Sequence, residues 1–211
     1  MTVELLGYKI DTKIVDEELP KIFPYTLKEK NMIDEEFFSR LAEKKNLVYD
    51  RRNIQYNPEV QFFHTYAYKE IMKEPENIKK FDDPTIFETS GRFYRKGLVN
   101  PNSDMYFDME KYYPTPKEII DLIKKANGLV FIPHIYDYGE YSEGIFDTFI
   151  NNCEIDGMEC YHPRFSKEQT EYLLDYCKKN NLYKSGGSDY HGTTAKMGSL
   201  NVPADLILDW V

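Results

Sequence analysis

Histidine and aspartate side chains occur directly after three apolar or strand-like segments of this sequence. The three places are Pro133-His134, Tyr161-His162-Pro163 and Gly186-Gly187-Ser188-Asp189-Tyr190-His191-Gly192. Imidazole and carboxylate groups bind Zn, Mn and Fe, and they also accept and donate protons in catalysis. The sequence therefore offers metal-dependent or acid–base chemistry, provided that the fold brings these places together.

Asp189 and His191 form the sharpest candidate pair. One residue separates them, so both side chains can point to the same side of an extended segment. A carboxylate beside an imidazole is a ligand pair that leaves coordination positions open for water. An alternative fits the spacing as well, because the stretch could be a glycine-rich turn whose aspartate caps the following segment.

The other candidates also have structural interpretations. His134 and His162 could be hydrogen-bonded polar residues near turns, and His64 lies in an amphipathic segment where a packed structural histidine is expected. Arg92 and Arg95 belong to a basic cluster that could meet a phosphate. A solvated helix face explains the same cluster.

The elements that must position these residues alternate between helix and strand from Thr115 to Gly186. Capping boxes beginning at Thr115 and at Ser166 predict two helix starts. The other predicted elements are a short helix over 142–152 and strands over 129–132, 157–161 and 182–186. This alternation predicts a parallel sheet or part of a barrel, in which functional groups gather beyond the carboxyl ends of the strands.

The preceding part of the chain is predicted to contain one strand over 2–10, followed by helical and irregular structure over 11–113. Helix starts are expected at Asp34, at Asn57-Pro58 and at Asp83-Pro84. A strand that begins at residue 2 indicates either an edge strand or a chain that has been cut inside a larger domain.

Composition excludes several classes of protein. The 211 residues include 36 acidic and 27 basic side chains, for a formal net charge of −9, and 41% are hydrophobic. This argues for a packed core and against bulk nucleic-acid binding, and no apolar run is long enough to span a membrane. The three cysteines form no CxxC motif, and no secretory signal is visible, so a cytoplasmic location is expected.

The order of these motifs resembles that of the PHP (polymerase and histidinol phosphatase) family of metal-dependent phosphoesterases. The matching segments are Gly128-Leu129-Val130-Phe131-Ile132-Pro133-His134, the family-like "GxxGIEVY" strand at 155–163, the "GSDxHG" motif at 185–192, and, more loosely, the "VHILGYxID" strand at 3–11. The resemblance implies an α/β fold with a partial, distorted (β/α)7 barrel. It assigns 1–11 to a barrel strand, 12–113 to a helical insertion and 114–211 to the carboxyl-terminal half of the barrel.

The resemblance also implies a cluster of divalent metals (Zn, Mn or Fe) that activates water to attack a small phosphoester, such as a nucleotide or a sugar or amino-alcohol phosphate. His134, Asp189 and His191 match positions associated with the metal site, and Asp189 could in addition accept the proton of the nucleophile. The phosphate of the substrate would be held by His162, Arg92 and Arg95.

Two metal motifs of the family, H-x-H and T-D-H, are absent from this sequence, and Glu4 stands where many members have histidine. We therefore expect a carboxyl-terminal portion of a phosphoesterase with an incomplete metal site and no activity by itself. The alternative is a non-catalytic binding or assembly module, completed by another chain or by self-association through exposed strand edges. An unrelated α/β hydrolase is disfavoured because no G-x-S-x-G motif is present.

Overall fold

The computed structural model describes residues 3–190, 198, 200–203, 206 and 210, which fall into two compact units. The helical unit is Phe23–Tyr113. The sheet unit combines Val3–Ile22 with the described residues of Pro114–Val211. No helix among the described residues has the length and apolar character needed to cross a membrane.

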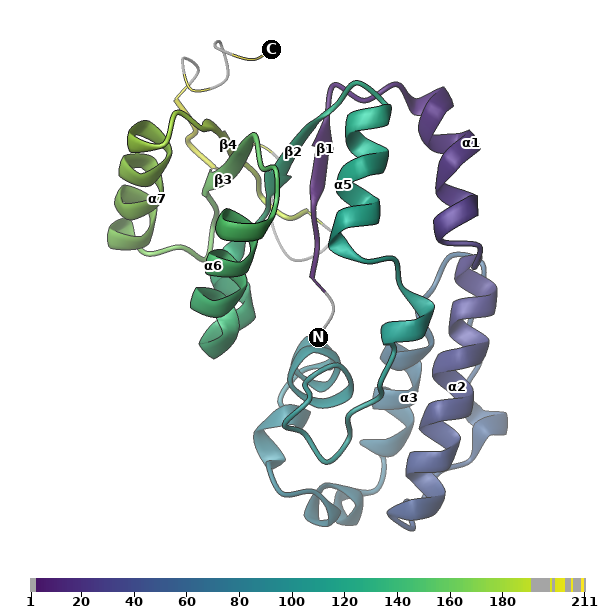
Figure 1. Ribbon diagram of the computed structural model, residues 1–211. Coiled ribbons are helices and arrows are strands. Elements are labelled where there is room, and N and C mark those ends of the chain that lie inside the picture. Colours follow the sequence, from purple (N-terminus) through teal and green to yellow (C-terminus); the bar gives the residue numbers. More distant parts are fainter. Residues whose placement is uncertain (1–2, 191–197, 199, 204–205, 207–209, 211) are drawn as a thin grey trace. The chain divides into compact units, whose positions relative to one another are not determined.

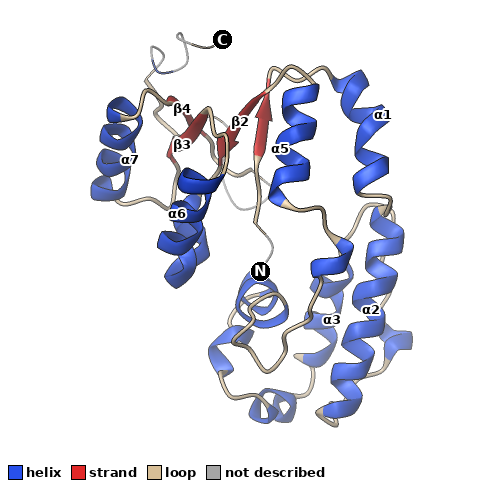
Figure 2. Ribbon diagram, viewed as in Figure 1, coloured by secondary structure: helices blue, strands red, loops and turns tan. Residues whose placement is uncertain are grey.

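The sheet unit is built on strands in the order β1-β2-β3-β4 (Figure 2). They are β1 (Leu6–Tyr8), β2 (Leu129–Ile132), β3 (Gly157–Tyr161) and β4 (Tyr183–Gly186). β1 pairs antiparallel with β2, whereas β2, β3 and β4 run parallel to one another. The result is an α/β fold with a mixed four-stranded sheet, an arrangement consistent with part of a barrel.

Four α-helices accompany this sheet among the described residues (Figure 1). They are α1 (Thr12–Ile22), α5 (Pro116–Lys125), α6 (Ser142–Asn152) and α7 (Lys167–Lys179), and a 3₁₀ segment η6 (Ile135–Tyr141) precedes α6. Helix α1 contacts α5, where Lys125 pairs with Glu18 at 2.9 Å. One apolar cluster joins β2 and β3 to α6 and α7, and a second joins β2 to α5.

Most predicted elements of the sheet unit are confirmed. The capping boxes of Thr115 and Ser166 are both present, and they start α5 and α7. The strands over 129–132 and 157–161 and the helix over 142–152 have the predicted bounds, and β4 begins one residue later than predicted. The first strand is shorter than predicted, and it lies at an edge of the described sheet.

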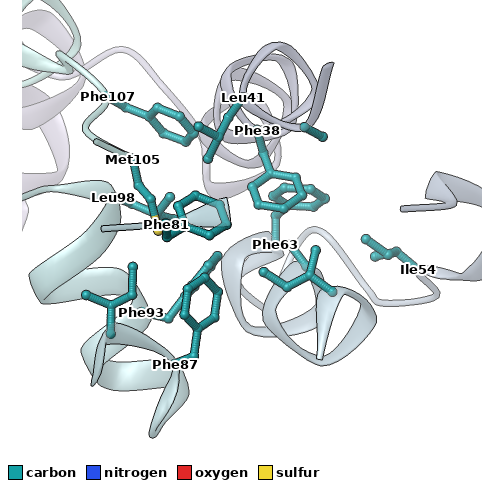
Figure 3. Close-up of a cluster of buried hydrophobic side chains, with 14 of the residues drawn as sticks. Phe38, Leu41, Ile54, Phe63, Phe81, Phe87, Phe93, Leu98, Met105 and Phe107 are labelled. Atoms are coloured by element: carbon teal, nitrogen blue, oxygen red, sulfur yellow. The ribbon is translucent and has the colours of Figure 1, made fainter. Parts of the chain in front are cut away.

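The helical unit consists of short helices around an aromatic core (Figure 3). Its α-helices are α2 (Leu27–Lys44), α3 (Phe63–Ile71) and α4 (Ser90–Arg92). Its 3₁₀ segments are η1 (Arg51–Asn53), η2 (Pro75–Lys80), η3 (Pro84–Phe87) and η5 (Glu110–Tyr112). The segment η4 (Phe93–Leu98) is a π-helix. The rings of Phe63 and Phe93 contact Phe38 with centroid distances of 5.8 and 6.2 Å.

Two predicted helix starts in this unit are wrong. Asp34 lies buried in the middle of α2, because the capping box of Thr26 and Glu29 starts that helix earlier. Asn57 instead holds a turn, in which it accepts the backbone N–H of Glu59 at 3.0 Å, and α3 begins only at Phe63. Asp83 does cap a helical segment, but that segment is the 3₁₀ turn η3.

Two fully buried asparagines hold the irregular segments of the helical unit. The side-chain amide of Asn31 donates to the carbonyls of Pro58 and Gln61, both at 2.8 Å, and its oxygen accepts the N–H of Phe63. Asn77 donates to the carbonyl of Val48 at 2.8 Å and to that of Ile71 at 3.0 Å, and it accepts the N–H of Val48. These contacts supply partners to backbone groups in the loops and at the two ends of α3.

Candidate metal centre

The functional side chains of the sheet unit follow the carboxyl ends of its three parallel strands. The segment 134–137 follows β2, 162–164 follows β3, and 187–189 follows β4. Because neighbouring parallel strands end at the same edge of a sheet, three segments that are distant in sequence meet there. The alternation of helices and strands in the sequence predicts this convergence.

Asp137, His162 and Asp189 form a group that could hold a metal ion. Each offers one ligand atom, and these atoms all lie within 4.8 Å of one another. Among the described residues, no other group of three or more His, Cys, Asp or Glu side chains has this spacing. Two carboxylates and one imidazole are ligands that suit Zn, Mn or Fe and leave positions for water.

The environment of His162 fits a metal ligand. The side chain is almost fully buried, with 4% of the residue exposed. Nδ1 accepts a long hydrogen bond of 3.4 Å from the backbone N–H of Arg164, while Nε2 is buried without a hydrogen-bond partner among the described residues. Burial lowers the pKa of His162, and the charge of Arg164 lowers it further, which favours the neutral imidazole that metals bind.

Arg164 places one positive charge against the two carboxylates. Its Nε donates to Oδ1 of Asp137 at 2.8 Å, and its Nη2 donates to Oδ2 of Asp137 and, at 2.9 Å, to Oδ2 of Asp189. The hydrogen bonds to Asp137 raise the pKa of Arg164 above its usual value. One guanidinium therefore bridges two of the three candidate ligands.

His134 lies beside this group but is engaged elsewhere. Its Nε2 lies 2.8 Å from Oε2 of Glu4, and its ring centroid lies 6.0 Å from that of His162. Burial lowers the pKa of His134, but the hydrogen bond and the charge of Glu4 outweigh it, so the net shift is upward. Glu4, whose role the sequence left open, is thus an ion-pair partner of His134.

Glu159 connects the loops that follow β2 and β4. The side chain is buried, and its Oε2 accepts the backbone N–H of His134 at 2.8 Å. A Cβ atom at Gly187 would lie 2.1 Å from Oε1 of Glu159, so a side chain at position 187 would displace this carboxylate. Burial raises the pKa of Glu159, and the N–H of His134 opposes that shift.

The structure corrects one argument about Asp189. Its φ is 49°, in the left-handed region, so the chain is not extended there and strict alternation of side chains does not apply. His134 also has a positive φ, of 21°. Sparsely populated backbone conformations of this kind concentrate at functional sites. His191 lies outside the described residues.

The candidate residues therefore separate into two sets. Asp189, a predicted metal ligand, and His162, a predicted phosphate contact, lie together in the candidate metal group with Asp137. Asp137, Arg164 and the position of Glu159 beside these loops were not predicted from the sequence. The sequence feature that could have indicated them is their position, since each lies within three residues of His134 or His162, which follow parallel strands. Arg92 and Arg95 belong to the helical unit, where Arg92 pairs with Glu88, and their phosphate-binding role stays a prediction.

Comparison with known proteins shows the fold. No protein-family model matches the chain, and no curated protein matches it. Among solved structures, the chain is similar to a protein from Bifidobacterium adolescentis named as a metal-dependent phosphoesterase, with a TM-score of 0.64 and 18% identity over 99% of this chain and 70% of that one. It is also similar to an amidohydrolase from Chromobacterium violaceum, whose structure holds sulfate and no metal, with a TM-score of 0.57 and 18% identity over 90% of this chain and 63% of that one. The chain therefore has a fold that is also found in metal-dependent hydrolases.

Proposed function

We propose that this chain is the metal-binding part of a PHP-type phosphoesterase that hydrolyses a small phosphoester. The observation that carries the proposal is the group of Asp137, His162 and Asp189, in which the buried Nε2 of His162 has no hydrogen-bond partner among the described residues. The motif order in the sequence and the similarity to a protein named as a metal-dependent phosphoesterase support it. The substrate class is a nucleotide or a sugar or amino-alcohol phosphate.

The side chains have distinct proposed roles. Asp137, His162 and Asp189 hold one divalent ion (Zn, Mn or Fe), which when bound acidifies a water and offsets charge on phosphoryl oxygens. Asp189 also accepts the proton of the attacking water. Glu159 keeps the β2 and β4 loops in place around the ligands. Further proposed ligands are His134 and His191, and further proposed phosphate contacts are Arg92 and Arg95.

Low turnover by this chain alone is part of the proposal. The sequence contains neither H-x-H nor T-D-H, so the family's multinuclear site lacks those ligands here. Asp137, His162 and Asp189 would hold a single ion, which would supply less stabilisation of the attacking and leaving oxygens than a two-metal site.

Metal content and phosphatase activity should be measured together. We expect the purified chain to bind about one Mn²⁺ or Zn²⁺ per molecule, as the three ligands imply. Asp137→Asn and Asp189→Asn should each weaken metal binding by about tenfold or more, because they remove an anionic ligand. Hydrolysis of p-nitrophenyl phosphate should stay near background.

A matched control is Asp175→Asn, which removes an exposed carboxylate of α7 that pairs with Lys179. It should leave metal binding unchanged. Equal metal binding by wild type and both ligand variants, or none by any of them, would contradict the proposed centre. Metal-dependent turnover that disappears in Asp189→Asn would show that the chain completes its site, and that our expectation of low activity is wrong.

A non-catalytic binding or assembly module remains the second candidate. The observation that favours it is the Arg164 guanidinium, which already pairs with both Asp137 and Asp189 and offsets part of their charge. Under this alternative the ion pair is purely structural. The same metal titration decides between the two, since a structural ion pair predicts no metal-dependent change.

A further inference from the structure

We propose that Arg164 takes the place of the metal's charge in the metal-free protein and that metal binding releases it to form a phosphate-binding site. This inference rests on the proposed function, because it assumes that Asp137 and Asp189 are metal ligands. It adds that the metal and the anionic substrate bind in a coupled way, and that one side chain provides the coupling.

The contacts of Arg164 show why it competes with a metal. The guanidinium donates to both carboxylate oxygens of Asp137 and to one of Asp189. A metal held by the same two carboxylates would need lone pairs on these oxygens. A divalent ion next to a guanidinium is also strongly repelled at short distance. The two cations therefore cannot both stay in full contact with the carboxylates.

Burial indicates which partner moves. The side chains of Asp137 and Asp189 are 8% and 21% exposed, whereas that of Arg164 is 45% exposed. The carboxylates are therefore fixed by their surroundings, and the guanidinium has solvent to move into. Arg164 lies three residues after the end of β3, and its backbone N–H donates to Nδ1 of His162, so the released guanidinium stays on a short tether beside the ligands.

The chemistry of the released group identifies the ligand class. A guanidinium presents a planar fork of N–H donors that matches two phosphate oxygens, and it stays charged at all physiological pH values. A phosphoryl group bound near the metal would find this fork within reach. Metal binding and phosphate binding should therefore favour each other, and by linkage the effect is reciprocal.

Calorimetric titration tests the first half of this proposal. Mn²⁺ is titrated into metal-free wild type, Arg164→Gln and Arg164→Lys. Removing the competing cation should tighten Mn²⁺ binding by roughly tenfold in Arg164→Gln, since charged hydrogen bonds no longer oppose it. Arg164→Lys keeps the charge, so its Mn²⁺ affinity should stay close to that of wild type.

The second half is tested with inorganic phosphate. Phosphate should bind to Mn²⁺-loaded wild type and bind at least about tenfold more weakly to the metal-free protein, as expected for coupled sites. In Mn²⁺-loaded Arg164→Gln and Arg164→Lys the affinity for phosphate should fall by roughly tenfold, because the bidentate fork is lost. Arg52→Gln is the matched control, since Arg52 pairs with Asp50 in a similar bidentate way but belongs to no candidate metal group.

The outcomes separate this inference from the proposed function. Weaker or unchanged Mn²⁺ binding by Arg164→Gln, with Mn²⁺ still lost in Asp189→Asn, would overturn the inference and leave the metal centre intact. Unchanged phosphate affinity in both Arg164 variants would also overturn it. Absence of Mn²⁺ binding by every protein, wild type included, would overturn both. Circular dichroism and thermal unfolding check that each variant is folded, and if Arg164→Gln is not, the loss of phosphate affinity in Arg164→Lys still tests the proposal.

Discussion

His134, His162 and His64 show how the surroundings of one residue type decide its role. Each of the three keeps a buried ring nitrogen without a hydrogen-bond partner among the described residues. That of His162 lies next to two carboxylates, whereas His134 is held by Glu4 through its other ring nitrogen. His64 belongs to the helical unit and stacks on Tyr94 with a centroid distance of 4.4 Å. Of these three, only His162 belongs to the group of described side chains that has the spacing of metal ligands, so residue type alone does not identify that group.

His64 should make the stability of the protein depend on pH. Burial, with a contribution from the charge of Lys30, lowers its pKa from 6.5 to about 4. Between these values the unfolded chain binds a proton that the folded chain does not, so stability is lost as pH falls from 6.5 to 4. The loss is up to about 3 kcal/mol.

Urea unfolding of wild type and His64→Phe between pH 7 and pH 4 measures this effect. The phenylalanine keeps the aromatic stack but cannot titrate, so the free energy of unfolding of the variant should fall less steeply with acidity. Parallel pH profiles for the two proteins would show that His64 is not held neutral.

At the scale of secondary-structure elements, short local signals explain what was predictable. Capping boxes start α5 and α7 where the sequence places them, because such a box is complete within four residues. The wrong start at Asp34 has the same origin, since an earlier box at Thr26 overrides it. Loops held by distant partners, such as those that Asn31 and Asn77 organise, carry no comparable local signal.

Replacing Asn77 should test how the irregular elements are held. Asn77→Leu removes the side-chain partner of the carbonyl and the N–H of Val48 and one of the two donors to the carbonyl of Ile71, so the free energy of unfolding should fall by about 3 kcal/mol. The exposed Asn180→Leu at the end of α7 is the control, and its effect should stay within about 0.5 kcal/mol. Chemical denaturation measures the free energy of unfolding of both variants. Equal effects would contradict the proposal that the hydrogen bonds of Asn77 hold the irregular segments in place.

At the scale of the whole molecule, the candidate ligands come from segments of one unit that are far apart in sequence. Asp137, His162 and Asp189 all belong to the sheet unit, and each follows a different parallel strand. The helical unit has an aromatic core of its own. A metal ion that binds to this group should therefore stabilise the sheet unit directly, by mass action.

Hydrogen exchange followed by mass spectrometry should reveal this difference. With saturating Mn²⁺, we expect slower exchange in peptides that cover 134–137, 162–164 and 187–189, because metal binding restricts their opening. Peptides from the core of the helical unit, such as 63–71, should change little. Equal protection throughout both units, or the same protection in Asp189→Asn, would argue against a metal group at this place.

The sequence by itself determined the type and bounds of most elements in the sheet unit, and the approximate places of His162 and Asp189. These features depend on periodicity, caps and glycines within a few neighbouring residues. Only the tertiary structure decided that Asp137 and Arg164 join them, that Glu4 engages His134, and that Gly187 must pass Glu159. Those contacts depend on which strands are neighbours and on the left-handed turn at Asp189, and both are set by packing between residues far apart in the chain.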